Sequence, residues 1–391
     1  MSLKRINRRS FIKGSMLGAS LTYLSPSALS NLATHFDNSS QKVKRPITRR
    51  LGKTGIELPV VSMGVMRSDN PALVRAALES GMVHLDTAHG YQKGKNETML
   101  GEVLKDYPRT SFVISTKIGE EDKETFLSKL DTSLQRLRLE YVDILYLHGA
   151  SSTGDVLSPH ILDALKTAKD SGKAKHVGVS THKNEPEVIQ ASIDSGLYEV
   201  VLTAINFKQD HYQDLTNVIG KAAGAGIGII GMKTMAGGFH DKEKTRPVNC
   251  KAALKWVLQD EHVTTTIPGI TTFEQLAENT SVNFDLRMTE EEKADLAAGK
   301  SEGGLYCQEC GQCTQNCNKG LPIPEIMRAY MYTYGYGDPS MGYALLTSLN
   351  MADNPCGDCT FCPVQCAKGF QVAERITDIA RLATVPGEFL S

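Results

Sequence analysis

The sequence predicts an α/β fold: a (β/α)8 barrel of the TIM type, followed by a small α-rich domain at the C-terminus. Eight short runs rich in β-branched residues alternate with segments long enough to form helices. Several of these segments end in the Ser-Gly pair expected at a helix C-terminus, as at 80–81, 171–172 and 195–196. A doubly wound sheet would usually need a glycine-rich fingerprint after its first strand, and Met63-Gly64-Val65-Met66 is not one. The barrel is therefore the favoured fold.

The barrel's expected strands are defined by their apolar, β-branched character. In chain order they are residues 60–63, 83–86, 112–115, 142–146, 176–179, 200–203, 227–230 and 264–267. Helical patterns between them include residues 71–80, 123–139, 159–171 and 273–282. The strands and helices together assign residues 48–300 to the barrel and leave 301–391 for the C-terminal domain.

The first 30 residues resemble a twin-arginine export signal. Arg8 and Arg9 are followed by Phe11, then by a mildly apolar stretch at 14–24 and small residues at 25–30. Residues 31–47 are polar and are expected to form a flexible leader. We therefore expect export to the periplasm, with the twin-arginine translocase as a transient partner. A frayed basic tail is the alternative.

Charge is unevenly distributed along the 391 residues. The whole chain carries 43 basic and 44 acidic side chains, but residues 1–50 hold ten Lys/Arg and only one acid, Asp37. The remaining 33 basic and 43 acidic side chains make the rest of the protein acidic, which argues against binding a phosphate backbone. No apolar run approaches the roughly 20 residues of a membrane span. Nucleic-acid binding and a stable membrane span are therefore not expected.

Titratable residues stand at the ends of three successive expected strands. Asp86, Lys117 and His148 follow strands two, three and four, and Tyr91 lies in the loop after Asp86. The carboxyl ends of the strands form the face of such a barrel on which active sites are built. Each residue has a structural explanation when taken alone, but four at neighbouring strand ends indicate a catalytic group.

These residues lie in segments that resemble the active-site blocks of the aldo/keto reductase family. The segments are 85–91 (LDTAHGY), 115–117 (STK) and 143–148 (DILYLH). The resemblance implies reduction of a carbonyl, or oxidation of an alcohol, with hydride exchanged by NAD(P)H. Tyr91 would be the general acid/base, and Lys117, held by Asp86, would bring the tyrosine's pKa toward the working range. His148 would orient the oxygen of the small carbonyl or alcohol substrate.

The same resemblance implies a set of nucleotide-binding residues in the later loops. Met232 stands where the family usually has a tyrosine that stacks on the nicotinamide ring, and no arginine is present for bidentate binding of a 2′-phosphate, so NAD and NADP stay open. The implied cofactor-binding residues are Ser180, Asn206, Met232, Lys233, Gly269, Thr271, Gln275, Glu278 and Asn279.

Eight of the nine cysteines lie in the last third of the chain, in two identical runs. The C-x2-C-x2-C-x3-C spacing is the bacterial ferredoxin pattern for [4Fe–4S] ligation, in which the fourth cysteine of each run serves the other cluster. One cluster would be held by Cys307, Cys310, Cys313 and Cys366, and the other by Cys356, Cys359, Cys362 and Cys317. A proline usually follows the fourth cysteine, but this chain has Asn318 in one run and Ala367 in the other. The exchange of the fourth cysteine between the two clusters is therefore less strongly predicted than the clusters themselves.

Zinc and disulfides are the competing uses of these cysteines. Two runs of four do not divide into zinc-ribbon spacing. Disulfides would suit an exported protein, but the twin-arginine route carries proteins already folded, so that clusters can be inserted before export. We therefore expect two [4Fe–4S] clusters in a ferredoxin-like domain.

Three functions are compatible with this pattern. The first is a nicotinamide-linked oxidoreductase whose barrel is coupled to, or braced by, the clusters. The second is an iron–sulfur electron-transfer protein whose barrel docks a redox partner protein. The third is a barrel that binds a sugar-like ligand without turnover. Binding alone would need no proton donor with an adjusted pKa at Tyr91, so the four strand-end residues argue against it.

Overall fold

A computed structural model describes residues 45–241, 243–300, 304–357 and 359–390. The predicted export signal at 1–30 and nearly all of the leader at 31–47 lie outside the described residues. Residues 45–391 form one compact unit. Within the described ranges, no helix combines the length and apolarity that crossing a membrane requires.

Eight parallel strands form the sheet of the predicted barrel. Each strand pairs with the next in chain order, and the isolated bridges Val61–Thr266 and Gly64–Gly269 join the first strand's segment to the last. The strands are β3 (Met63–Gly64), β4 (His84–Asp86), β5 (Val113–Ile118), β6 (Val142–Leu147), β7 (Ala174–Thr181), β8 (Val200–Ala204), β9 (Gly228–Met232) and β10 (Val263–Thr266). The predicted eight-stranded α/β barrel is confirmed.

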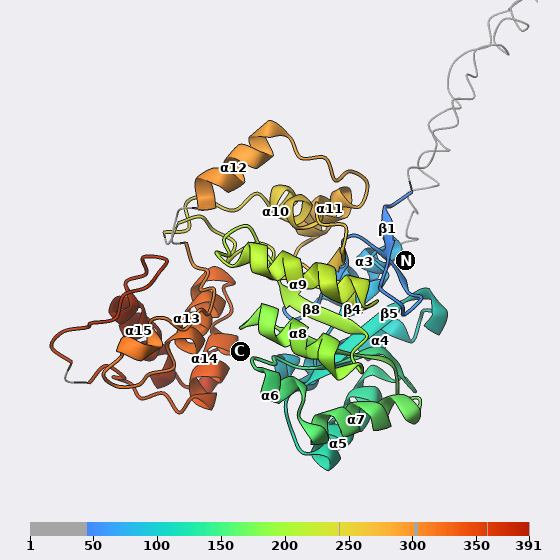
Figure 1. Cartoon of the computed structure of the whole chain (residues 1–391), viewed down its shortest axis with the longest axis horizontal. Helices are drawn as coiled ribbons and strands as arrows, with labels where there is room; N and C mark the ends of the chain where they lie inside the picture. The colour runs from blue at the N-terminus through green and yellow to red at the C-terminus, as the bar shows by residue number, and fades with distance from the viewer. Residues whose placement is uncertain (1–44, 242, 301–303, 358, 391) are drawn as a thin grey trace, which may run out of the picture. The chain divides into compact units, whose positions relative to one another are not determined.

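Helices connect successive strands and run outside them (Figure 1). Their inward faces are apolar: Phe126, Leu130 and Leu134 of α5, for example, belong to the main buried cluster. The helices are α3 (Pro71–Glu79), α4 (Lys95–Leu104), α5 (Lys123–Leu137), α6 (Thr153–Val156), α7 (Pro159–Asp170), α8 (Glu185–Ser195), α9 (Tyr212–Gly224), α10 (Cys250–Val257), α11 (Phe273–Val282) and α12 (Glu290–Lys300), with 3-10 turns η1 (Tyr91–Gly94) and η2 (Arg109–Ser111).

An antiparallel hairpin precedes the barrel. Its strands are β1 (Thr48–Arg50) and β2 (Glu57–Pro59). Leu51 and Leu58 are fully buried in one cluster with barrel residues such as Tyr146 and Leu202. The backbone NH of Lys53 donates to the carbonyl of Gly226, just before β9, at 2.8 Å. The hairpin therefore covers the amino-terminal end of the barrel, opposite the strand ends that carry the predicted site.

Short helices and loops make up the cysteine-rich segment after residue 304. We call residues 304–390 the cysteine module; it contains the helices labelled α13, α14 and α15 in Figure 1. Its buried cluster includes Ile323, Ile326 and Ile376. The elements are η3 (Thr314–Asn316), α13 (Ile323–Tyr330), the π-helical turn η4 (Met331–Gly335), α14 (Pro339–Ser348), α15 (Val372–Ala380), η5 (Arg381–Thr384) and η6 (Gly387–Leu390).

Candidate active site

The four residues singled out at the strand ends line one cavity. Asp86, Tyr91, Lys117 and His148 all contribute to the wall of a space of about 1820 Å³ at the carboxyl end of the barrel. The register of the sheet brings them together, because Asp86 on β4 pairs with Ser115 on β5, and Lys117 lies two residues further along the same face of β5. We call Asp86, Tyr91, Lys117 and His148 the tetrad.

A buried ion pair forms the base of the tetrad. Asp86 and Lys117 are each 2% exposed, and the Lys117 ammonium donates to the Asp86 carboxylate and, at 2.6 Å, to the Thr87 carbonyl. The Ser115 hydroxyl donates to the other Asp86 oxygen at 2.6 Å. Burial lowers the pKa of Lys117, whereas the neighbouring Asp86 carboxylate favours the charged ammonium. The aspartate therefore fixes the lysine in position and compensates its charge.

Tyr91 projects from the turn η1, which the preceding loop holds against the sheet. The NH of His89 donates to the carbonyl of Lys117 at 3.0 Å, extending the ladder beyond β4. Lys117 Nζ lies 5.0 Å from the centroid of the Tyr91 ring. Burial, followed by the charge of Asp86, raises the pKa of Tyr91. Tyr91 therefore holds its proton at neutral pH.

His148 faces Tyr91 across the cavity. The two rings are 6.0 Å apart at their centroids and inclined at 80°. The backbone NH of His148 donates to the Ile118 carbonyl at 2.7 Å, which fixes the residue beside the end of β5. Burial, with the nearby cation Lys117, lowers the pKa of His148 to about 3. The imidazole is therefore neutral near pH 7.

The residues expected to hold a nicotinamide nucleotide divide into two groups. Asn206 is buried and bonded within its own loop, accepting from the Lys208 NH at 3.0 Å. Asn279 accepts a hydrogen bond from the Cys250 thiol at 2.7 Å, and neither it nor Glu278 belongs to the cavity wall. The wall does include Ser180, Met232, Lys233, Gly269, Thr271 and Gln275.

The cavity also fits a nucleotide by features that the sequence prediction missed. Thr234 lines the cavity, is 1% exposed, and its buried hydroxyl has no hydrogen-bond partner within the described part of the chain. A side chain added at Gly238 or Gly269 would meet nothing within 4 Å, so the wall is open there. An unpaired buried hydroxyl is costly, which makes Thr234 a suitable contact for a polar cofactor. Its position beside Lys233 is the only signal that the sequence carries.

The first cysteine run inserts a carboxylate beside the cavity. Glu309, between Cys307 and Cys310, has a side chain only 2% exposed and adopts a left-handed φ of 56°. Its oxygens lie 3.2 Å from His182 Nδ1, 3.6 Å from Lys233 Nζ and 3.1 Å from Arg328 Nη1. Burial alone would raise the pKa of Glu309, but His182, Lys233 and Arg328 hold it at about 2. We call Glu309, His182, Lys233 and Arg328 the ionic cluster.

His182 was missed although the sequence offered a signal for it. It stands two residues beyond Ser180 at the end of β7, so that strand alternation places both on the same face, and both line the cavity. Glu309 and Arg328 had no such signal, because only the folded module brings them to the barrel.

Two tyrosines of the cysteine module line the same cavity as the tetrad. Tyr332 and Tyr336 come from the π-helical turn η4 and the residue after it, and their ring centroids are 5.8 Å apart. The Tyr336 NH donates to the Met331 carbonyl at 3.0 Å, which is the wide hydrogen bond of a π turn. In the structure they form part of the cavity wall.

The cysteines of the two runs line two further cavities. One, of about 330 Å³, is lined by Cys307, Cys310, Cys313 and Cys366. The other, of about 790 Å³, is lined by Cys317, Cys356, Cys359 and Cys362. We call these sets the inner and the outer quartet. Each unites three cysteines of one run with the fourth of the other, which is the grouping expected for exchanged ligands.

No cysteine is paired in a disulfide; all nine lie in the described ranges. Within those ranges, no three His, Cys, Asp or Glu side chains are arranged to hold one metal ion. A [4Fe–4S] cluster is bound by four cysteine thiolates, one on each iron, so it does not require several ligands around one ion.

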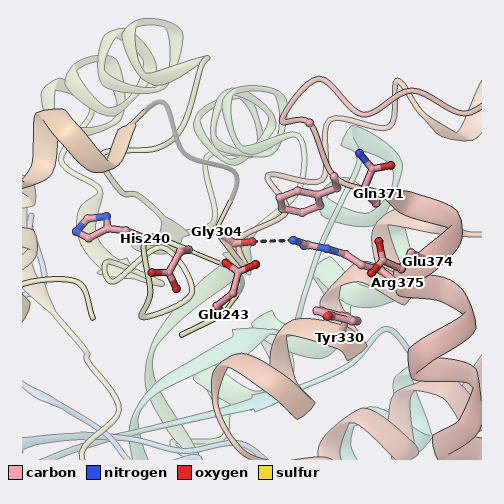
Figure 2. A pocket seen from close by; sticks show the side chains of 10 residues that line it. His240, Glu243, Gly304, Tyr330, Gln371, Glu374 and Arg375 are labelled. Atoms are coloured by element: carbon pink, nitrogen blue, oxygen red, sulfur yellow. Dashed lines mark hydrogen bonds between the residues drawn. The ribbon is translucent and has the colours of Figure 1, made fainter. Parts of the chain in front are cut away.

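A further cavity, of about 820 Å³, lies between the cysteine module and the loop after β9 (Figure 2). None of the tetrad residues lines it. Arg375, 6% exposed, points across it and donates to the Gly304 carbonyl at 2.9 Å. The guanidinium also lies 3.7 Å from the centroid of the Phe370 ring. Arg375 therefore joins α15 to the start of the module.

Comparisons with known proteins agree with this geometry. Residues 61–251 match the model of the aldo/keto reductase family. An L-glyceraldehyde 3-phosphate reductase of Escherichia coli O157:H7 is 26% identical over 327 residues, covering 66% of this chain and 93% of that protein. A methylglyoxal reductase of Salmonella typhi is 28% identical over 256 residues, covering 62% and 92%.

Solved structures show the same fold. An aldo-keto reductase from Bacillus halodurans, in its holo form, superposes with a TM-score of 0.56 at 20% identity, covering 65% of this chain and 96% of that one. The fold, the family model and the curated relatives together show that the barrel of this chain is similar to the aldo/keto reductases, a family of NAD(P)H-dependent oxidoreductases.

Proposed function

We propose that this protein reduces a small carbonyl compound, with Tyr91 as the proton donor, and that its cysteine module carries two [4Fe–4S] clusters. The tetrad carries the catalytic part of the proposal: a tyrosine and a neutral histidine face each other above a buried lysine–aspartate pair. A nicotinamide nucleotide, when bound, supplies the hydride. Ser180, Met232, Lys233, Thr234, Gly269, Thr271 and Gln275 are the wall residues that would hold it.

The roles of the tetrad follow from the protonation states of its members. Tyr91 retains its proton because burial and Asp86 raise its pKa, so it is able to donate that proton to an oxygen that gains negative charge. His148 is neutral and can donate a hydrogen bond to the same oxygen from the facing side. Lys117 adds a fixed positive charge near the developing alkoxide.

Tyr91→Phe tests the catalytic role. The variant removes the phenolic proton and leaves the ring, so carbonyl-dependent oxidation of NADH or NADPH should fall about 10²–10⁴-fold while nucleotide binding is retained. Tyr141→Phe, at the start of β6 and away from the cavity, is the matched control. Unchanged turnover in Tyr91→Phe would exclude this assignment.

The two quartets support the iron–sulfur part of the proposal. The inner quartet lies next to Glu309 and thus next to the ionic cluster at the active-site cavity. The outer quartet is more accessible, since Cys359 and Cys362 are exposed. Clusters held by these thiolates would supply one-electron redox chemistry, or would brace the module against the barrel.

A second function, electron transfer with a redox partner protein, is favoured by one observation. Phe361, inside the second cysteine run, is 75% exposed beside Cys362 and offers an apolar contact for a partner. In that case the clusters would be reduced by the partner, and the barrel would bind no nucleotide. Titration of the iron-loaded protein with NADH and NADPH distinguishes the two functions.

We further propose that the protein is exported to the periplasm by the twin-arginine translocase. The proposal is supported by the Arg8-Arg9 segment and by a cysteine module that would have to acquire its clusters before export. Replacing both arginines by lysine should retain the protein in the cytoplasm, as fractionation would show. Continued export of that variant would exclude the route.

A further inference from the structure

One cation of the active-site wall has no acidic partner among the residues that the structure describes. Arg67, in the loop between β3 and α3, lines the cavity and is half-buried. The interaction found for its guanidinium among the described residues is with the Tyr336 ring, whose centroid lies 5.9 Å from Cζ. A cation–π contact leaves the N–H groups of an arginine free to bind an anion.

The other cations around the cavity are already compensated. Lys117 is paired with Asp86. Lys233 is paired with the carboxylate of Glu309, which also contacts the imidazole of His182. Arg67 is therefore the wall cation whose charge a bound molecule could neutralise, and pairing there would cost no existing ion pair.

Arg67 lies on the same side of the cavity as the proton donor. The Gln92 side-chain amide, next to Tyr91, donates to the carbonyl of Met66 at 3.2 Å and so ties the two loops together. The wall residues expected to hold the nucleotide come mainly from the loops after β9 and β10. An anion at Arg67 would thus belong to the molecule that reacts at Tyr91.

The π turn of the cysteine module completes this part of the wall. Tyr332 and Tyr336 bring hydroxyl groups and ring faces to the cavity, and Tyr336 is the ring on which Arg67 rests. The Asp338 NH donates to the Tyr332 carbonyl at 2.9 Å, which fixes the end of the turn. The turn therefore contacts Arg67 through the Tyr336 ring and leaves the hydrogen-bond donors of the guanidinium unused.

We infer that the substrate is a carbonyl compound bearing a carboxylate or phosphate group, and that Arg67 binds this anion beneath Tyr332 and Tyr336. The inference rests on the proposed carbonyl reduction. It adds the class of substrate and makes Arg67 the residue that determines it. A guanidinium binds either anion through two parallel hydrogen bonds, so the structure specifies the charge that carboxylate and phosphate share.

Two matched substrate pairs test the inference with the full-length protein. Succinic semialdehyde is compared with its methyl ester, and glyceraldehyde 3-phosphate with glyceraldehyde, in the wild type, Arg67→Met and Arg67→Lys. Arg287→Met is the control, because that arginine is 90% exposed and lies outside the cavity wall. The affinity for NADH and NADPH is measured in parallel.

We expect the wild type and Arg287→Met to prefer the anionic member of at least one pair. The test quantity is kcat/KM for the anionic carbonyl divided by kcat/KM for its neutral counterpart. In Arg67→Met this ratio should fall at least about tenfold, because KM for the anionic carbonyl rises. Arg67→Lys should give an intermediate ratio, because lysine keeps the positive charge but cannot donate the two parallel hydrogen bonds of a guanidinium. The pair that responds identifies the anion as carboxylate or phosphate.

Three results would overturn the inference. A wild type that reduces neutral and anionic carbonyls equally well has no such specificity. A ratio that is the same in Arg67→Met and the wild type removes Arg67 from substrate binding. Weaker NAD(P)H binding in Arg67→Met, with both members of a pair affected alike, would assign the arginine to the nucleotide. If the wild type reduces none of the four carbonyls, the proposed function itself fails.

Discussion

At the scale of single residues, the buried pair of Lys117 and Asp86 links the stability of the barrel to its chemistry. Both side chains are almost completely buried, and the lysine also donates to the Thr87 carbonyl. Removing one partner leaves the other charged and desolvated, which typically costs about 3–5 kcal/mol. The pair also fixes the loop that carries Tyr91.

We predict that Lys117→Met lowers the free energy of unfolding by about 3–5 kcal/mol and abolishes turnover. The double variant Asp86→Asn/Lys117→Met should recover part of that stability, because no unpaired charge remains, while turnover stays absent. Denaturant unfolding and NAD(P)H oxidation measure the two effects. A double variant less stable than Lys117→Met would show that the two residues do not act as a pair.

A buried histidine makes the barrel sensitive to acid. Burial lowers the pKa of His84 from 6.5 to about 4, and its Nε2 lies 3.1 Å from the Ser115 hydroxyl. Below pH 6.5 the unfolded chain binds a proton that the folded chain does not, so the stability of the fold falls as the pH is lowered toward 4.

His84→Gln should reduce this acid sensitivity. Between pH 7.5 and pH 5 the wild type is expected to lose about 2 kcal/mol more than the variant in its free energy of unfolding. Urea unfolding at the two pH values measures the difference. Exposed His262→Gln serves as the control and should behave as the wild type does. Equal losses in His84→Gln and the wild type would contradict the lowered pKa.

At the scale of elements, the ionic cluster joins the cysteine module to the barrel. Glu309 brings one carboxylate among His182, Lys233 and Arg328, whereas the Lys183–Glu325 pair nearby is partly exposed. Buried charges left without a partner are costly, and exposed pairs contribute roughly 0–1 kcal/mol. Glu309 is therefore expected to contribute much more than Glu325 to the stability of the contact between the module and the barrel.

Glu309→Gln should loosen the module, and Glu325→Gln should leave it in place. In Glu309→Gln we expect faster hydrogen exchange and faster proteolysis of residues 304–390, equivalent to a loss of about 3–5 kcal/mol of stabilisation. In Glu325→Gln the stabilisation of the same residues should fall by less than about 1 kcal/mol. Iron content is measured in both variants. Equal protection in the two variants would show that the ionic cluster does not hold the module.

The quartets make a prediction about which cysteines belong together. Cys310→Ser combined with Cys366→Ser changes two ligands of the inner quartet, so about four irons per chain should be lost. Cys310→Ser combined with Cys317→Ser changes one ligand in each quartet, and both clusters should be impaired. Iron and sulfide analysis distinguishes the two variants. If the Cys310/Cys317 variant instead lost one whole cluster and the Cys310/Cys366 variant impaired both clusters, each run would supply all four ligands of its own cluster.

The sequence predicted the elements that repeat, and missed those that depend on contacts distant in the chain. The strand containing Asp86 and the strand containing Lys117 lie where the alternation placed them, because parallel strands bring their carboxyl ends to one face. The first strand was expected at 60–63, but the structure forms β3 at Met63–Gly64, and Val61 only bridges Thr266 of the last strand. The hairpin of β1 and β2 was not predicted.

The additional parts of the site were not visible in the sequence for a similar physical reason. Glu309 adopts a left-handed backbone conformation that no local pattern signals, and its partners are far from it in the chain. Tyr332 and Tyr336 face the cavity because a π turn shifts the helical phase. Arg67 looked like an ordinary loop residue. Tertiary packing gives each of these residues its place at the cavity.

At the scale of the whole molecule, the barrel supplies the tetrad, and the cysteine module supplies part of the cavity wall. Tyr332 and Tyr336 come from the module, and Glu309 of the first cysteine run contacts Lys233 of the barrel. This arrangement gives the inner quartet a direct connection to the active site. The arrangement would couple the proposed iron–sulfur clusters to the barrel without a further subunit.

The most direct test of the account is one titration on the full-length protein purified anaerobically, with iron and sulfide quantified in the same sample. NADH and NADPH are added, followed by succinic semialdehyde or glyceraldehyde 3-phosphate. The account predicts that at least one nucleotide binds and is oxidised only when the carbonyl is present, and that Tyr91→Phe binds it without oxidation. Clusters that can be reduced in a protein that binds neither nucleotide would contradict it.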